Sequence, residues 1–573
     1  QMTTIAAKLE QAYPRSNKYK GVLVQRMLDT MVSNVRLTLY LLLGAVGLVL
    51  LIACANVANL LLAKATSRTR EIAIRAAVGA SRSRIVKQLV SESLVLAVLA
   101  GVAGLILAVW IADALVHIGP ANVPRLAQTG VDGWVLGFTF AISIVSSLLF
   151  GLAPAIQSSR VDLNEALKQG AAKSVVGGGT GQLRNALVVA EIALSVILLI
   201  GAGLLIRSFE ALTNVDVGYR TERILTASVD VPASSNEATA HAVQFDTDLV
   251  NDLRALPGVN AVGAAAAIPG STRSNGTYWI DVLPPPNEIA ITKDSAVFSV
   301  IGPGLFDTVG IPIKLGRDFN AGDTGDKNFT AIVNEALVKA SFGGRDPIGR
   351  LIFCGLDSMK PMTIVGVVAD IHQYGPDQAP APEIYMPYAQ HPGWSTNMSM
   401  LIRTSADPST ISEAVRRKVR ERSTDVPVRI ARLQDNADKA VAAPKFRTLL
   451  LAIFAGLAVL LAMAGVYGVM AYVVGQRSNE IGLRMALGAS SGNVLKLVLG
   501  QGLILTLIGI AIGLAGAVAA TRLLESLLFE VKPTDPLTYA AVAVLLTAVA
   551  TVASLIPALR AARVDPLVAL RQE

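Results

Sequence analysis

The sequence is poor in charge, cysteine and aromatic side chains, and each shortage excludes a class of protein. Only 16% of the 573 residues are charged, against about 25% in an average soluble domain. Two cysteines cannot build a disulfide-stabilised scaffold. Aromatic residues make up 5%, and no basic stripe carries stacking rings, so we predict no nucleic-acid partner. The 52% hydrophobic content excludes intrinsic disorder.

The charge deficit is concentrated in seven apolar stretches, each about 20 residues or longer, which predict membrane spans. Six carry no charge at all, and a seventh, 185–206, is interrupted by Glu191 alone. We therefore predict an α-helical polytopic membrane protein that contacts the lipid bilayer. The six uncharged stretches are 37–63, 93–112, 133–159, 448–476, 497–521 and 536–559.

The distribution of Lys and Arg predicts the orientation, because short basic loops stay in the cytoplasm. The loops after the first and third stretches are rich in basic residues, whereas the loop 117–131 has only Arg125. Alternation then places residues 208–446 outside the cytoplasm and the C-terminus inside. The net charge of +8 is thus explained by topology.

The sequence contains an internal repeat with a constant offset of 409 residues, at which Glu71–Ser81 matches Glu480–Ser490. The second copy has one span, a soluble region and three spans. The first shows only three spans, preceded by residues 1–36, which resemble the end of the second soluble region. Because the chain also begins at Gln1, we expect that one span and most of one outer domain are missing from it.

This organisation predicts six segments. Residues 208–446 alternate strand-like and helix-like runs, which favours one α+β extracytoplasmic domain. The segments are 1–36, the C-terminal remnant of a first such domain; 37–169, a first three-span domain; 170–184, a Gly-rich cytoplasmic linker; 185–207, the helix opening the second repeat; 208–446, the extracytoplasmic domain; and 447–573, a second three-span domain.

The repeated cytoplasmic motif predicts a short amphipathic helix. Glu71 and Arg75 are four residues apart with the acid first, the favourable order for an ion pair. Gly79 ends the helix, and Ser81 is placed to cap the next one. Such a helix either completes the loop or docks on the bilayer or a partner, and its repetition favours docking. The second copy repeats all four residues as Glu480, Arg484, Gly488 and Ser490.

Three polar residues fall inside predicted spans. Glu191 is either functional or paired within the bundle, or it lies near the inner interface and reaches the headgroups. Asn56 and Asn59 share one helical face and are expected to hydrogen-bond to neighbouring helices. They align with Gly465 and Gly468 in the second copy, so the two copies are not equivalent.

Motifs for covalent chemistry are missing from the sequence. No Gly-x4-Gly-Lys-Ser/Thr loop occurs, the four histidines have no zinc-ligand spacing, and no Gly-x-Ser-x-Gly elbow is present. We therefore predict that the chain is not an enzyme, has no catalytic, metal or cofactor-binding residues, and leaves any ATP binding to a separate partner subunit.

The repeated Glu-Ile-x-x-Arg-x-Ala-x-Gly-Ala-Ser pattern, with the Pro-Ala…Arg-x-Asp…Ala-Leu tail, resembles the FtsX-like, MacB-type permeases of ABC systems. The duplicated arrangement is similar to acidobacterial duplicated orphan permeases, here N-terminally truncated. Outer-domain motifs such as Gly302–Phe306, Gly316–Phe319 and Asp346–Arg350 support the resemblance. It implies that 37–169 and 447–573 are FtsX-like domains and that 208–446 is a MacB-type periplasmic core.

The resemblance also implies a function. The loop helices would be coupling helices that contact a cytoplasmic ABC ATPase, and the chain would be a permease subunit in a bacterial inner membrane. Movement would pass to the outer domain and its envelope protein partner, for efflux or mechanical transmission. The alternative is a cell-envelope signalling or regulatory scaffold that acts without transport.

Overall fold

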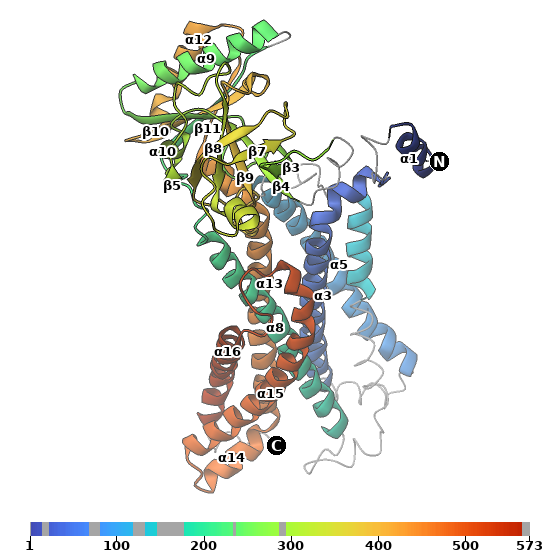
Figure 1. The fold of residues 1–573 in the computed structure, drawn as a ribbon. Helices are drawn as coiled ribbons and strands as arrows, with labels where there is room; N and C mark the ends of the chain where they lie inside the picture. Colours follow the sequence, from blue (N-terminus) through green and yellow to red (C-terminus); the bar gives the residue numbers. More distant parts are fainter. Residues whose placement is uncertain are drawn as a thin grey trace. The chain divides into compact units, whose positions relative to one another are not determined.

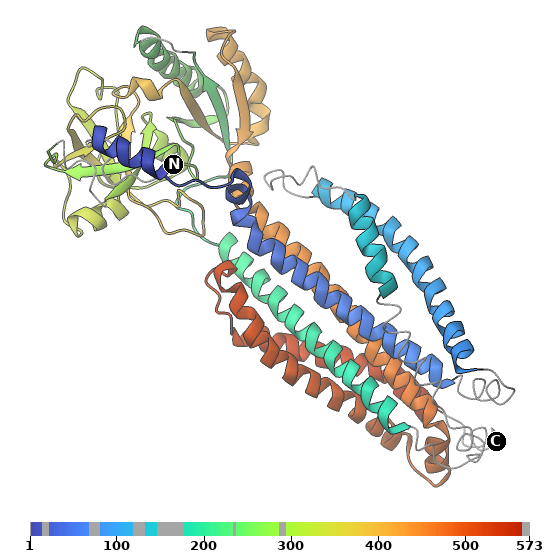
Figure 2. The same cartoon turned by 90° about the vertical axis from the view of Figure 1, so that its right-hand side faces the viewer.

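The computed structural model describes residues 2–13, 22–67, 81–118, 132–145, 177–232, 236–285 and 294–563. They form two compact units (Figures 1 and 2). The sheet unit comprises residues 1–26 and 212–442, and the helical unit comprises 27–211 and 443–573. Each unit is described by itself.

The helical unit holds the apolar helices. Six helices in the described residues are long and apolar enough to cross a membrane, namely α3, α5, α8, α13, α15 and α16. The seventh predicted stretch, 133–159, is described only through an apolar helix over Gly133–Val145, and its remainder lies outside the described residues. The helices are α3 (Met27–Ser67), α5 (Arg82–Ile118), α8 (Gly177–Thr213), α13 (Leu433–Gln476), α14 (Ser478–Ala486), α15 (Ser491–Ala520), η6 (Thr521–Leu527) and α16 (Pro536–Ala562).

Helix α8 is the most enclosed of these helices. Of the 18-residue apolar segment of α8, 56% of the residues are buried, whereas 17% are buried in the corresponding segment of α3. One stripe, including Ile192 and Val196, joins a cluster with α13, α15 and α16. A second stripe, including Leu198 and Ala202, joins a cluster with α3 and α13. Helix α8 is thus packed on two sides, as an all-round apolar helix must be.

The sheet unit is built on one mixed sheet of eleven strands in the order β11-β1-β10-β2-β4-β3-β7-β8-β6-β9, with β5 paired to β8. Most pairs are antiparallel, and β4–β9 and β6–β8 are parallel. The strands are β1 (Ile224–Asp230), β2 (Val259–Ala265), β3 (Ser274–Ile280), β4 (Ser295–Ile301), β5 (Ile313–Gly316), β6 (Phe329–Asn334), β7 (Leu351–Cys354), β8 (Met362–Val368), β9 (Glu383–Pro387), β10 (Asn397–Thr404) and β11 (Val428–Arg432).

Helices α9 and α12 cover one part of this sheet (Figure 1). Phe245, Leu249 and Leu253 recur every four residues or so along α9 and are buried in the main core with Val415 and Val419 of α12. The predicted α+β class is confirmed. The helical segments are α1 (Met2–Ala12), α9 (Asn236–Arg254), α10 (Leu305–Val309), α11 (Glu335–Leu337), η3 (Val338–Phe342), η4 (Pro392–Trp394), η5 (Pro408–Ile411) and α12 (Ser412–Arg422).

Candidate functional site

Helix α14 lies in the loop between α13 and α15 and carries the second copy of the predicted coupling motif. Within it, Arg484 Nη2 lies 2.6 Å from Glu480 Oε1, which forms the predicted i,i+4 ion pair. The two side chains are 50% and 48% exposed, so the pair adds only a few tenths of a kcal/mol, about the value of a helix-surface pair. Its main effect is to hold the carboxylate and the guanidinium in fixed positions on the surface of α14.

Helix α14 ends at the predicted glycine. Gly488 has φ +94°, a left-handed conformation that favours glycine after a helix C-terminus. Its N–H donates to the Met485 carbonyl at 3.0 Å, and the Ala489 N–H donates to the Arg484 carbonyl at 2.9 Å. These bonds satisfy the last carbonyls of α14 and turn the chain toward α15.

The two serines of the repeated motif occupy equivalent turns. The Ser490 carbonyl accepts from the Asn493 N–H at 2.9 Å before α15, and the Ser81 carbonyl accepts from the Arg84 N–H at 3.0 Å before α5. Ser490 has the extended backbone of an N-cap residue, but in the described chain its side chain makes no capping hydrogen bond. A backbone turn therefore begins α15, without the predicted side-chain cap.

The remaining residues of the first motif, Glu71, Arg75 and Gly79, lie outside the described residues. Their ion pair and helix end stay predictions.

Helix α14 has two unlike faces. Ile481 is 3% exposed and lies in the cluster formed with α13, α15 and α16. Leu483 and Leu487 are 51% and 80% exposed, and their spacing of four places them on one face. An anchored helix that presents leucines beside an ion pair is suited to docking on another surface.

A polar cluster joins three helices inside the helical unit. The Asn56 Nδ2 of α3 donates to Glu191 Oε1 of α8 at 2.6 Å and to the Leu461 carbonyl of α13 at 3.0 Å. Glu191 is 1% exposed. Of the two interpretations of Glu191, the structure therefore favours pairing within the bundle over contact with headgroups. The expected interhelical hydrogen bond of Asn56 is present.

A glycine on α13 makes room for this cluster. A Cβ at Gly465 would overlap Glu191 Oε2 and would lie 2.6 Å from Asn56 Oδ1, so any side chain here would have to displace one or both of these groups. Gly465 is the repeat counterpart of Asn56, so an amide on α3 faces a glycine on α13. The difference between the copies thus has a steric reason.

Asn59, one turn further along α3, is 5% exposed. Neither of its amide atoms has a hydrogen-bond partner among the described residues, and the same holds for Glu191 Oε2. The expected interhelical bond of Asn59 is therefore not formed in the described chain. A mainly apolar cavity of about 280 Å³ lies alongside, lined by Ala53, Asn56, Val57, Asn59, Leu60, Arg184, Leu461, Ala464, Gly465, Gly468 and Val469.

Two basic residues of α8 were missed as site residues. Arg184 is buried, with its guanidinium 4.2 Å from the Tyr472 ring centre, a cation–π contact. Arg207 forms an ion pair with Asp535, which also accepts from the Thr538 N–H and caps α16. The Thr538 hydroxyl and Arg207 hold the pKa of Asp535 at about 2. Both arginines flank the apolar stretch 185–206 in the sequence, and this placement could have identified them as candidates for contacts at the two ends of the helix.

Two buried carboxyl groups of the sheet unit were also missed. Glu383 accepts from Ser299 Oγ at 2.5 Å, Gln373 Nε2 at 3.0 Å and the Tyr385 hydroxyl at 2.8 Å, and burial raises its pKa to about 7. Asp246 is 0% exposed without a partner for either oxygen in the described chain. Burial raises the pKa of Asp246 to about 8, so at neutral pH the protonated form predominates.

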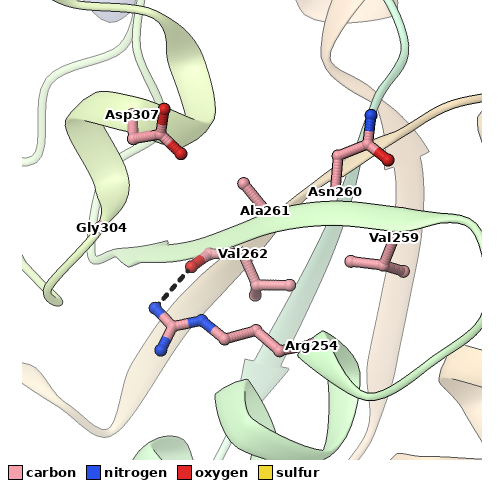
Figure 3. A pocket seen from close by; sticks show the side chains of 7 residues that line it. All are labelled: Arg254, Val259, Asn260, Ala261, Val262, Gly304 and Asp307. Atoms are coloured by element: carbon pink, nitrogen blue, oxygen red, sulfur yellow. Dashed lines mark hydrogen bonds between the residues drawn. The ribbon is translucent and has the colours of Figure 1, made fainter.

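A pocket of about 320 Å³ lies beside β2 in the sheet unit (Figure 3). Arg254 of α9 and Asp307 of α10 are its charged lining residues. Arg254 Nη2 donates to the Val262 carbonyl at 2.9 Å and to the Pro303 carbonyl at 3.1 Å. Because this guanidinium satisfies backbone carbonyls, we interpret the pocket as structural. Among the described residues, no group of three or more His, Cys, Asp and Glu side chains is placed to hold a metal ion.

Comparison with known families agrees with this arrangement. The FtsX-like permease C-terminal family matches residues 43–163 and 452–566, and the MacB-like periplasmic core domain family matches 186–422. The chain is a member of the FtsX-like, MacB-type permease family. The two FtsX-like matches begin at residues 43 and 452, in the register of the 409-residue repeat. This is a family of membrane permeases, and a multi-pass chain with a periplasmic-type domain fits an inner membrane.

Individual relatives are distant. The chain is 28% identical over 299 residues to "Macrolide export ATP-binding/permease protein MacB 1/2" of Paracoccus denitrificans, covering 49% of this chain and 42% of that protein. It is 29% identical to MacB of Mannheimia succiniciproducens, covering 48% and 43%. It is 23% identical to "Uncharacterized ABC transporter permease YknZ" of Bacillus subtilis, covering 65% and 94%. The chain thus spans less than half the length of these MacB relatives.

Proposed function

We propose that this permease is the membrane subunit of an ABC-type system in which a separate cytoplasmic ATPase acts on the two loop helices, for efflux or mechanical transmission. The observation that carries the proposal is α14. Its Ile481 side is anchored in the helical unit, and its other side presents Leu483 and Leu487 beside the Glu480–Arg484 pair. Exposed leucines next to fixed charges are suited to recognition by a protein partner.

That the ATPase is a separate protein is part of this proposal. Residues 1–573 contain no Gly-x4-Gly-Lys-Ser/Thr loop, so the proposal assigns no nucleotide binding to these residues. The names of the MacB relatives combine "ATP-binding" with "permease", and YknZ is named a permease alone. In this proposal the chain supplies the permease function only.

The connections of the chain provide a route for movement. Helix α13 begins at Leu433, directly after β11 ends at Arg432. A displacement of α13 is therefore delivered to the sheet without an intervening loop. With the topology predicted from basic loops, α14 and the C-terminus are cytoplasmic and the sheet unit is outside, so α13 carries movement across the membrane to an envelope partner.

The test is recovery of an ATPase with the full chain from native membranes. We expect L487D to reduce the recovered ATPase by at least about tenfold, since an exposed leucine at a docking surface contributes to binding but little to the fold. E480R, which places like charge beside Arg484, should have the same effect. E421K is the matched control, because it breaks a comparably exposed i,i+3 pair with Lys418 on α12.

The alternative, a signalling scaffold without transport, gives a different result. If no ATPase accompanies the wild-type chain with or without nucleotide, or if L487D and E480R retain it at the wild-type level, the coupling proposal is wrong and the scaffold is favoured. Thermal unfolding of each variant distinguishes lost docking from lost fold.

A further inference from the structure

Helix α8 is tightly interlocked with α15. A Cβ at Gly513 of α15 would lie 2.6 Å from Val196 Cβ and 2.8 Å from the Ala193 carbonyl, and a Cβ at Gly509 would lie 2.7 Å from Ile192 Cβ. Glycines at this spacing let two helix backbones approach closely. Helices α8 and α15 therefore behave as one body.

The opposite side of α8, toward α3 and α13, is closed by apolar contacts and by long polar ones. Ser195 Oγ donates within α8 to the Glu191 carbonyl at 2.8 Å and lies 3.5 Å from the Ala458 carbonyl of α13. Thr448 Oγ lies 3.5 Å from the Leu205 carbonyl, and both 3.5 Å contacts are at the outer limit for a hydrogen bond. The cavity of about 280 Å³ runs along this side, between residues of α3 and α13. Among the described residues, a short bond between side chains at this boundary joins Asn56 to Glu191.

This side of α8 contains a second position that matches the first. Asn59 and Gly468 stand three residues beyond Asn56 and Gly465 on two helices that run in the same direction. Asn59 is buried without a partner in the described chain, and the nearest atom to a Cβ at Gly468 is Leu60 Cδ2 at 3.8 Å. An unpaired amide in a membrane is costly, and here it lies beside open space.

We propose that α3 and α13 slide past α8 by three residues, about 4.5 Å along the helix axis, so that the Glu191 carboxyl exchanges Asn56 for Asn59. Gly468 then takes the place of Gly465 beside the carboxyl. Asn59 is thus the positioning residue of a second register, and shifts of one helical turn are an established form of switching. The hydrogen bond lost in one register is replaced in the other, so the slide leaves the Glu191 carboxyl with an amide donor in both.

The position of α14 connects this movement to the rest of the chain. Helix α14 joins α13, on one side of the sliding boundary, to α15, on the other. Val466, Val469 and Met470 of α13 pack in one apolar cluster with α15 and α16, so the slide also moves α13 along this non-directional contact. A partner that displaces α14 therefore moves α3 and α13 against α8 and α15. That an ATPase provides the displacement rests on the proposed function, whereas the existence of two registers does not.

The test compares two cysteine pairs in the full chain in lipid nanodiscs, without any ATPase. The two native cysteines, both buried, are replaced by C54A and C354A. S195C/A458C reports the register described here, because Ser195 faces Ala458, and S195C/L461C reports the register shifted by three residues. After mild oxidation, mass spectrometry of the digested protein gives the disulfide-linked fraction of each pair.

We expect N56L to raise the ratio of S195C/L461C to S195C/A458C disulfide about tenfold, since a hydrogen bond to a carboxyl is removed from one register only. N59L should lower the S195C/L461C disulfide below its wild-type level. Because Asn59 has no hydrogen bond to lose in the described register, N59L should fold even where N56L does not.

An unchanged ratio in both variants would overturn the proposal and indicate a static cavity in which water satisfies Asn59. Failure of ATPase recovery in the earlier experiment leaves this result intact. The two proposals therefore fail separately.

Discussion

Two glutamates, Glu191 in the helical unit and Glu383 in the sheet unit, are equally buried at 1% exposure but unequally satisfied. Three side chains donate to the Glu383 carboxyl, whereas Asn56 alone donates to Glu191 in the described chain. A complete network holds one geometry, but an incomplete one leaves bonding capacity for another arrangement. The difference indicates that Glu383 is structural and that Glu191 lies where helices change partners.

Removing the complete network should have the largest effect. In Glu383→Leu, three buried donors lose their acceptor, so we expect the free energy of unfolding of the sheet unit to fall by about 3–5 kcal/mol. Thermal unfolding of the full chain, followed by fluorescence of Trp279 and Trp394, measures this. Glu335→Gln, on a half-exposed carboxylate 3.9 Å from Lys314, should change stability by less than about 0.5 kcal/mol. A Glu383→Leu protein that unfolds at the wild-type temperature would contradict the structural role.

The pH dependence of the sheet unit should be the next largest effect. Burial raises the pKa of Glu383 to about 7 and that of Asp246 to about 8. Both acids bind a proton more tightly when folded, so their stabilisation is complete below pH 4 and is lost as pH rises through 7 to 8. The loss is at most about 1.4 kcal/mol per pH unit for each group.

Unfolding temperatures measured from pH 5 to 8 test this expectation. Asp246→Asn should flatten the decrease, since it removes one titrating group, whereas Asp425→Asn at an exposed position should leave the slope unchanged. A wild-type protein whose stability rises over this range would show that other groups dominate.

Much of the fold is predictable because it is set locally. Membrane thickness alone requires apolar stretches of about 20 residues. Five charge-free stretches, and the stretch interrupted by Glu191, matched the six long helices of the described residues. Within 208–446, the sequence predicts strands at 223–231, 259–268, 363–371, 383–388, 398–403 and 426–433, which correspond to β1, β2, β8, β9, β10 and β11. The strands from β3 to β7 were not predicted. Strand β3 begins with Ser, Asn, Gly and Thr, and all four residues of β5 are exposed, so distant neighbours rather than a local pattern specify these two. Strands β4, β6 and β7 are apolar runs that were detectable from the sequence and were missed.

The contacts of the candidate site residues also divide into local ones, which the sequence predicts, and long-range ones, which it does not. The ion pair of Glu480 and Arg484 depends on helical spacing, so the sequence predicts it. The contact of Asn56 with Glu191 joins residues 135 positions apart, and no local pattern contains it. Asp246 is an intermediate case, because it lies in the apolar stripe of α9 with Leu249 and Leu253 and was detectable from that spacing.

A methyl group added at Gly465, next to Glu191, provides a further test of the comparison between Glu191 and Glu383. In Gly465→Ala the new methyl group would overlap Glu191 Oε2, so we expect a loss of about 1–3 kcal/mol and a weakened bond to Asn56. Gly456→Ala, on the same helix with nothing within 4 Å of its Cβ, is the control and should be neutral or slightly stabilising. Thermal unfolding in nanodiscs compares the two, and equal behaviour would mean that Glu191 moves freely away.

Substitutions of Asp535, at the N-terminus of α16, should have the smallest effect on the free energy of unfolding. Asp535 is 17% exposed and caps α16 through Thr538, so Asp535→Ala should cost about 1 kcal/mol. Asp535→Asn retains the capping oxygen but loses the charge opposite Arg207, and a partly exposed ion pair contributes little, so its cost should stay below about 0.5 kcal/mol. Thermal unfolding at low and high salt separates the two contributions, because only the ion pair is screened. If Asp535→Asn instead equals Glu383→Leu in its effect, then exposure does not rank these carboxyl groups, and the contrast between a structural glutamate and a mobile one loses its basis.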